Sequence, residues 1–550
     1  MTGPDFFYGV NRELFLRILL SNRGQANSMQ KYKEGSKVDF KKPVKRYRMP
    51  KSPGEFQQDK HIEREKVSPK LIDNIATVEN TFQDSLDFIV RKVRFGPSGQ
   101  VRMALVFLET LTDKQTLSDF ILEPLNYLSF EEFEVTQVPG KIIDILPTAL
   151  KIEEGTDWYQ LEKKIVTGHA LLFIDGYDRA IILEARKWKE RSISEPQSEV
   201  SVVGPREGFV ESLLTNASLL RRRLRTPNLI MEAIPIGTTS NTNVAICYLK
   251  GVVDEKLVAE VRKRVEAINV EAMYSVNLVS EIVADTHYTP FRLFATTERP
   301  DKLASALVEG RVGIIAENTP MALIVPSVFW QFFQSSEDYY EYFLLAAVNR
   351  GLRMASFFIV IGLTAAYVAV ATFHQEMIPT PLLLAMASVR EPVPLPTVVE
   401  ALLLETILEG LREAGLRLPK PAGQAVSIVG ALVMGQAAVE AGLVSPQMVI
   451  VVGLAAVGSF LIPDYSFVNA LRILKFFFIV LAGTFGAFGL MMGYMVLGLH
   501  LTSLKSFGVP YMAPVTPFRL RDMKDVFFRA PWWAMGKRGP KKRGKNDNED

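Results

Sequence analysis

The sequence predicts a soluble N-terminal region of two related α/β subdomains followed by an all-α, multi-span membrane domain. Residues 1–320 of the 550-residue chain mix charged and apolar side chains, whereas residues 321–501 are mostly apolar. Single apolar runs in the second half reach about the 20 residues that a helix needs to cross a bilayer. Strand and helix patterns alternate in the first half, and one strand–helix pair occurs there twice.

Residues 1–70 are predicted to be a basic, disordered extension. Many lysines, arginines and prolines and few apolar side chains lie between residues 31 and 51, a composition that does not bury a core. A solvated tail is the preferred interpretation, and a contact with nucleic acid or anionic lipid is the alternative, so that no nucleic-acid partner is expected. The basic residues concerned are Lys41, Lys42, Lys45, Arg46 and Arg48.

The N-terminal apolar patch does not read as a signal peptide. It covers Leu14–Leu20, is broken by Arg17, and is not followed by a small-residue cleavage site. We therefore expect the first half on the cytosolic side. The chain's net charge of +3 indicates no particular partner.

Residues 71–190 are predicted to form the first α/β subdomain and residues 191–320 the second. The elements expected in the first are a helix, a buried strand, a helix and a hairpin, at residues 71–90, 103–108, 114–122 and 171–184. Those expected in the second are a helix, an extended segment, a helix and a hairpin, at residues 209–224, 292–295, 297–309 and 312–325.

A weak internal repeat links the two subdomains. Residues 104–121 parallel residues 245–262 without gaps, each as a strand, a turn and a helix. Asp113 and Asp254 stand where a carboxylate would cap the helix that follows. Two related subdomains are one explanation, and a shared α/β pattern without common origin is the alternative.

Residues 321–505 are predicted to be the transmembrane domain, and residues 506–550 a basic cytosolic tail. Four spans are the central expectation, with Thr397–Leu418 either a fifth span or a helix in the interface. Arg350 and Arg353 precede the first span, which places its start on the cytosolic side. The four expected spans cover residues 354–373, 423–444, 448–462 and 476–501.

The sequence does not predict an enzyme, a metal site or a cofactor. It lacks a phosphate-binding loop, a dinucleotide fingerprint and paired Cys/His spacing, and its five histidines are scattered. The single cysteine, Cys247, lies in an apolar run and is expected to be a buried small hydrophobe.

Acidic side chains in the apolar half are the first candidate functional residues. Glu405 and Glu409 are four apart and share a helix face, and Glu440 lies in the next apolar run. Several copies around a pore would form acidic rings that concentrate cations. The alternative is an interfacial helix whose acids face water.

A stripe of small and mildly polar residues is the second candidate. Ser356, Val360, Thr364 and Val368 are each four apart in the first expected span. Such a stripe suits the wall of a narrow pore, and a helix–helix contact produces the same pattern.

Several separate motifs, in the same order, resemble the GerA family of spore germination proteins, specifically the A subunit of nutrient germinant receptors. They lie between residues 71 and 517, and the extension 1–70 falls outside the resemblance. The motifs are SEPQSEVSVVGPREGFVESLLTNASLLRRRL (Ser194–Leu224), TERPDKLASALVEGRVGIIAENTP (Thr297–Pro320), the stretch from VREPVPLP to PAGQ (Val389–Gln424), GQAAVEAGLVSP (Gly435–Pro446) and SFGVPYMAP (Ser506–Pro514).

This resemblance implies a function and partners. It implies a subunit in the inner membrane of the spore that oligomerises into a ligand-gated cation channel and so triggers germination. The implied partners are a transporter-like, germinant-binding B subunit and a lipoprotein C subunit. The alternatives are a non-conducting scaffold that clusters the receptor, and a related partner of the dipicolinic-acid release system.

Overall fold

The computed structural model describes most of the chain between its two ends. The described residues are 66–82, 85–95, 101–119, 123, 140, 151–186, 196, 199, 203–417, 435–518 and 522–531. Four predictions concern residues that lie wholly or partly outside these ranges. They are the extension 1–70, the subdomain boundary near residue 190, the span 423–444 and the tail 506–550.

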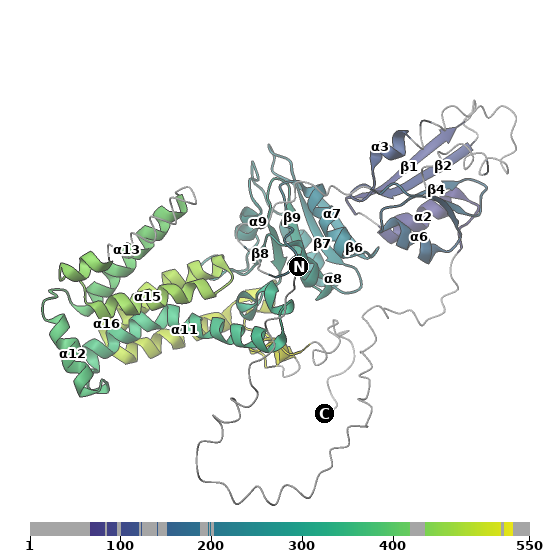
Figure 1. Ribbon diagram of the computed structural model, residues 1–550. Helices are drawn as coiled ribbons and strands as arrows, with labels where there is room; N and C mark the ends of the chain where they lie inside the picture. Colours follow the sequence, from purple (N-terminus) through teal and green to yellow (C-terminus); the bar gives the residue numbers. More distant parts are fainter. Residues whose placement is uncertain are drawn as a thin grey trace, which may run out of the picture. The chain divides into compact units, whose positions relative to one another are not determined.

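The first α/β unit is built on a five-stranded sheet with the order β1-β2-β4-β5-β3, in which neighbouring strands are antiparallel. Figure 1 labels three of these strands, β1, β2 and β4. Apolar side chains of α2 and α6 fill one face of this sheet, and Leu117 of α3 packs on the other. The elements are α2 (Leu71–Phe82), β1 (Phe88–Phe95), β2 (Val101–Leu108), α3 (Lys114–Leu117), β3 (Ile152–Gly155), α6 (Trp158–Ile165), β4 (Ala170–Ile174) and β5 (Ala180–Leu183).

The second unit has a five-stranded antiparallel sheet of the equivalent order, β6-β7-β9-β10-β8. Helices α7 and α10 cover one face, and α8 and α9 cover the other. The elements are α7 (Leu213–Arg223), β6 (Leu229–Ile236), β7 (Thr242–Leu249), α8 (Glu255–Glu266), α9 (Val276–Ile282), β8 (Ala295–Thr297), α10 (Pro300–Val308), β9 (Val312–Ala316) and β10 (Ala322–Val325).

The two units correspond element by element. Strands β1 and β6 begin at residues 88 and 229, and β2 and β7 at 101 and 242, so both pairs differ by 141 positions. Asp113 and Asp254 cap α3 and α8 by accepting a hydrogen bond from the backbone N–H two residues ahead. Asn74 and Asn216, both 1% exposed, each bind the backbone N–H and C=O of the residue six positions before. The repeat expected at residues 104–121 and 245–262 therefore falls on equivalent elements.

Most expected elements of the soluble half are present, with shifted ends. Both hairpins form, Pro300 stands in the first turn of α10, and Gly310 follows its end with a φ of +83°. The helix expected over 71–90 is wrong in its last part, because α2 ends at Phe82 and residues 88–90 pair with β2. The helix expected from residue 209 begins later, because the Ser212 hydroxyl caps it at that point.

A buried ion pair joins the two α/β units. Asp87 and Arg221 are both fully buried, and the guanidinium donates to both carboxylate oxygens at 2.9 Å. The Ser85 and Thr110 hydroxyls also donate to Asp87. Burial by itself raises the pKa of Asp87, but Arg221 and these hydrogen bonds outweigh burial and hold the pKa below its ordinary value.

The C-terminal region is helical. Its longer helices are α11 (Phe343–Phe373), α12 (Thr380–Arg390), α13 (Thr397–Arg417), α15 (Pro446–Leu461) and α16 (Tyr465–Ser503). Short elements complete it: η3 (Phe329–Phe333), η4 (Ser336–Tyr339), η5 (Gln375–Met377), β11 (Lys505–Ser506), β12 (Val509–Pro510) and η6 (Asp522–Asp525).

Two helices within the described residues, α11 and α16, are long and apolar enough to cross a membrane, while α12 and α15 are shorter apolar helices. The expected number of spans remains a prediction. The expected single span over 476–501 is wrong in one respect, because α16 is not continuous through it. Gly486 has φ 61° and ψ −141°, which no α-helix contains.

Helix α16 folds back on itself at Gly486. The Leu481 carbonyl oxygen lies directly against Gly489, where a Cβ would collide with it, and the ring centroids of Phe478 and Tyr494 are 4.9 Å apart. Sixteen residues of continuous helix would separate those two rings by about 24 Å. The two legs of α16, residues 465–485 and 487–503, therefore run antiparallel.

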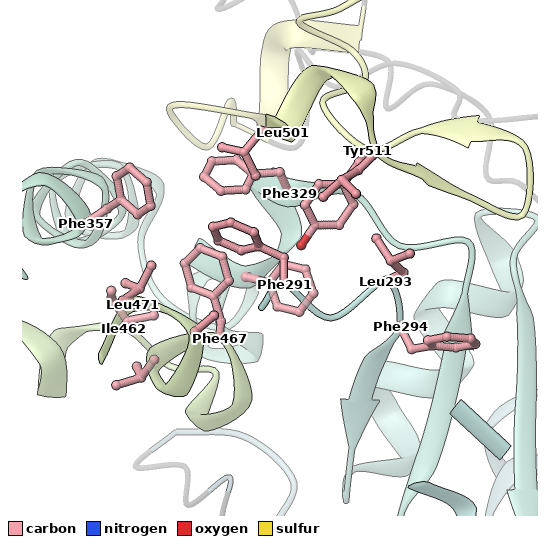
Figure 2. Packing of buried hydrophobic residues seen from close by; sticks show 14 of the residues in the cluster. Phe291, Leu293, Phe294, Phe329, Phe357, Ile462, Phe467, Leu471, Leu501 and Tyr511 are labelled. Carbon is pink, nitrogen blue, oxygen red and sulfur yellow. The ribbon is translucent and has the colours of Figure 1, made fainter. Parts of the chain in front are cut away.

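One hydrophobic core extends from the second sheet into the helical bundle. It begins with α8 and α9, continues through Phe291 and Phe329, and includes buried side chains of α11, α15 and α16. Figure 2 shows Phe291, Phe329, Phe467 and Tyr511 gathered at the point where these parts meet. The second α/β unit and the bundle thus share one packed interior.

Buried arginines fix the start of α11. Arg350 is fully buried and pairs with Asp338 of η4 at 3.2 Å and with Asp525 of η6 at 2.8 Å. Arg353, one turn later, pairs with Asp338 at 2.6 Å. Of the two arginines that precede the expected span, Arg350 thus ties the C-terminal segment to this helix, and both hold η4 against it.

Candidate functional site: an ion-pair network in the helical bundle

Glu405 of α13 lies inside the bundle, and both of its carboxylate oxygens have a hydrogen-bond partner. Its carboxylate is 2.5 Å from the Lys475 ammonium of α16 and accepts a hydrogen bond of 3.2 Å from the Thr364 hydroxyl of α11. The side chain of Glu405 is 2% exposed and that of Lys475 is 10% exposed. A buried charge of this kind is tolerated because it has an opposite partner.

Glu409 continues the same contact one turn along α13. It lies 2.9 Å from Lys475 and also pairs with Arg472 of α16. We call Thr364, Glu405, Glu409, Arg472 and Lys475 the bundle network. Two carboxylates and two cations make it neutral overall, so the repulsion expected between two acids on one helix face is offset inside one copy of the chain.

The helix pattern explains why these groups meet. Glu405 and Glu409 share one face of α13, and Arg472 and Lys475 are three residues apart on α16, so each pair presents its charges on one side. Sequence reasoning identified the acids but did not identify the two cations as their partners. The three-residue spacing of Arg472 and Lys475 was the available signal.

The predicted stripe is buried in the bundle. Ser356, Val360, Thr364 and Val368 are each at most 3% exposed, and Val360 packs against α15 at Gly458. Thr364 alone connects this stripe to the acids. A role in lining a pore requires other copies of the chain and stays a prediction.

Glu440 is separate from the other predicted acids. It is exposed, and its carboxylate accepts a hydrogen bond from Gln436 one turn earlier, at 2.9 Å. Within the described residues, no ion pair or hydrogen bond joins it to Glu405 or Glu409. Its predicted role in attracting cations stays a prediction.

Glu400 is a buried acid to which sequence reasoning assigned no role. Its side chain is fully buried, and one carboxylate oxygen accepts hydrogen bonds from both the N–H and the hydroxyl of Ser445. Ser445 is the N-cap of α15, so the carboxylate stands at the positive end of that helix. Arg390 lies 4.0 Å from the other oxygen. Glu400 therefore fastens α13 to the start of α15.

Two kinds of reactive group, a cluster of metal ligands and an accessible thiol, are absent from the described residues. No group of three or more His, Cys, Asp or Glu residues within the described ranges could hold a metal ion. Cys247 is fully buried, and burial raises the pKa of its thiol to about 12, which leaves it protonated and unreactive. The charged groups of the bundle network pair with one another and so hold α13 against α16.

The fold and the network define a class: an α/β region joined through a shared core to an apolar helical bundle with internal ion pairs. Residues 76–541 match the family described as Bacillus/Clostridium GerA spore germination protein. The chain belongs to the GerA family of spore germination proteins, which confirms the resemblance found in its motifs. This is a family of germinant receptor subunits with a role in spore germination, and it is not a family of known enzymes.

Individual relatives cover nearly the whole chain. The spore germination protein KA of Bacillus subtilis (strain 168) is 43% identical over 472 residues, which is 86% of this chain and 86% of that protein. Spore germination protein GerLA of Bacillus cereus is 35% identical and covers 84% of this chain and 94% of its own length. A crystal structure of the N-terminal domain of the A subunit of the Bacillus megaterium spore germinant receptor GerK3 is 26% identical, with a TM-score of 0.38, over 48% of this chain and 98% of that one.

Proposed function

We propose that this chain is the membrane subunit of a spore nutrient germinant receptor and oligomerises into a ligand-gated cation channel. In this proposal it lies in the inner membrane of the spore, with its α/β region on the cytosolic side. It acts there with a transporter-like B subunit that binds the germinant and a lipoprotein C subunit.

The position of the bundle network supports this proposal most. Lys475 is ten residues after Tyr465 and eleven before Gly486, or roughly 15 Å from either end of its helical leg. In the proposed membrane arrangement, where this leg crosses a hydrocarbon core about 30 Å thick, the network lies near the middle of the membrane. Charged groups at that depth are costly and typically mark an ion pathway.

The contact between Thr364 and Glu405 is a second support. The stripe of α11 and the acids of α13 were predicted separately, and this hydrogen bond of 3.2 Å brings them together. In the closed state the acids are neutralised by Lys475 and Arg472. Opening would move α16 relative to α13, so that the carboxylates exchange these partners for permeating cations.

Glutamine variants of the two acids test this function in spores. Glu405→Gln and Glu409→Gln should each change nutrient-triggered potassium release, because each removes one negative charge from the network. Glu413→Gln is the matched control, since Glu413 lies one turn further on α13, is 57% exposed, and pairs with Arg417 alone among the described residues. Potassium release at the wild-type rate in both Glu405→Gln and Glu409→Gln spores would remove these acids from the ion pathway.

A non-conducting scaffold is the second candidate function. The observation in its favour is the same neutrality of the network, because two acids paired inside one copy can simply hold three helices together. A scaffold would cluster the receptor while another subunit conducts. Conductance of the purified chain separates the two functions.

A further inference from the structure

The loop between α9 and β8 is the element of the second α/β unit that enters the helical bundle. It runs from Val283 to Phe294 and contains no helix or strand. In its second half Phe291 is 2% exposed, whereas Tyr288, three residues earlier, is 97% exposed. A deeply buried aromatic side chain anchors a surface loop at that point by packing.

Phe291 contacts both legs of α16. Its ring centroid is 5.9 Å from that of Phe467, in the first turn of the outgoing leg, and 6.3 Å from that of His500, in the last turn of the returning leg. It also meets Phe329 at 6.4 Å (Figure 2). One side chain of the α/β unit therefore lies between the two open ends of the hairpin.

Hydrogen bonds hold the loop on either side of Phe291. The Thr289 hydroxyl is 2.9 Å from Nε2 of His500 and also accepts the N–H of Phe291 at 3.2 Å. The carbonyl of Arg292 accepts a hydrogen bond from the Tyr511 hydroxyl at 3.0 Å. The loop is thus connected to the returning leg of α16 and to the segment that follows it.

The two ends of the loop are fixed to the same segment. The Asp285 carboxylate accepts the N–H of Phe507 at 2.5 Å and pairs with Arg264 of α8 at 2.9 Å. Arg264 also lies over the Phe507 ring, 4.5 Å from its centroid. At the other end the Leu293 carbonyl accepts the Ser506 hydroxyl at 2.7 Å. Polar contacts as well as packing therefore join the α/β unit to the segment that follows α16.

We propose that the loop Val283–Phe294 couples the second α/β unit to the α16 hairpin, with Phe291 as the positioning residue that sets the spacing of its two legs. The legs are joined covalently at Gly486, at the other end, so their separation at the open end depends on what lies between them. Withdrawal of Phe291 lets the legs approach, and this changes how Lys475 and Arg472 face α13. This inference rests on the proposed channel function.

Two loop variants and a neighbouring control test the coupling. Phe291→Ala removes the ring between the legs, and Thr289→Val removes the hydrogen bond to His500 with little change of volume. Tyr288→Ala is the matched control in the same loop, because its side chain is 97% exposed. Potassium release from spores would be measured against nutrient concentration, with the amount of each variant determined by immunoblot.

The expected result is a shift in nutrient sensitivity without a change in the conducting state. Phe291→Ala and Thr289→Val should shift the half-maximal nutrient concentration by on the order of 5- to 150-fold, the usual range for loss of coupling between sites. Tyr288→Ala should match wild type, and the single-channel conductance of all three should be unchanged in bilayers. If Phe291→Ala protein is absent from spores, the response of Thr289→Val spores alone tests the coupling role of the loop.

Two failures are distinguishable. If wild-type protein conducts and both loop variants respond to nutrient as wild type does, the coupling role of the loop is wrong while the channel stands. If wild-type protein never conducts, the proposed function is wrong. A shift of equal size in Tyr288→Ala would also overturn the inference, because it would reflect the loop in general and not its buried contacts.

Discussion

Replacing Lys475 with methionine tests the bundle network directly. The substitution removes the ammonium group that lies 2.5 Å from Glu405 and 2.9 Å from Glu409 and leaves a side chain of similar length. Glu409 keeps Arg472 as a partner. Glu405, with a side chain 2% exposed, keeps only the Thr364 hydroxyl as a polar partner among the described residues.

The expected cost follows from this loss of charge compensation. Removing one partner of a buried ion pair typically destabilises a protein by about 3–5 kcal/mol. The double variant Lys475→Met/Glu405→Gln should recover most of that amount, because it leaves no uncompensated charge at residue 405. Lys505→Met is the control, because Lys505 is exposed. A surface substitution of this kind usually changes the free energy of unfolding by no more than about 0.5 kcal/mol.

Unfolding of the purified full-length protein in detergent micelles, followed by circular dichroism, measures these differences. The coupling between residues 405 and 475 is the difference between the double variant and the sum of the single ones. A Lys475→Met protein as stable as wild type would refute the network as a structural element. A double variant less stable than Lys475→Met alone would refute the assignment of Glu405 as the group left unpaired.

Other contacts give three further predictions. Arg221→Met should destabilise the protein by about 3–5 kcal/mol in the same unfolding measurement, because it strands the buried Asp87. Folding lowers the pKa of Asp87, so the ionised carboxylate stabilises the protein fully above its unfolded pKa of about 3.9. This stabilisation is lost as the pH falls through the pKa of the folded state. If wild type stays more stable than Arg221→Met well below the folded-state pKa, the pairing is contradicted. Gly486→Ala should lower the free energy of unfolding by about 1–3 kcal/mol, because residue 486 has a positive φ. Gly498→Ala should not lower it, since a Cβ there meets nothing within 4 Å. Equal stabilities of the two variants would argue against the hairpin. Val360→Trp should alter potassium release from spores, and a wild-type response with normal protein levels would indicate that the stripe serves helix packing alone.

Local patterns predicted much of the soluble fold. Asp113, Asp254 and Pro300 act at helix starts as expected, because capping and the fixed φ of proline depend on neighbouring residues only. The residues Phe88–Val90 were read as the end of a helix, and they form a strand because β2 lies beside them. Strand pairing depends on residues distant in the sequence, and helical spacing over a short apolar run does not exclude it.

The helical region was predicted less well for a similar reason. Hydropathy records how long an apolar run is, and it does not record where the chain reverses inside it, so the run through Gly486 was read as one span. The acids Glu405 and Glu409 were found because carboxylates stand out in apolar sequence. Their partners are distant in the sequence: Arg472 is 63 positions from Glu409, and Lys475 is 70 positions from Glu405. The packing of α13 on α16 brings these residues together.

Reconstitution of the purified full-length chain in planar bilayers, with a potassium gradient across them, tests the channel most directly. The account predicts discrete, cation-selective current steps from wild-type protein, and an altered conductance in Glu405→Gln. Protein that is inserted and oligomeric but passes no current under any condition would contradict the channel and favour the scaffold.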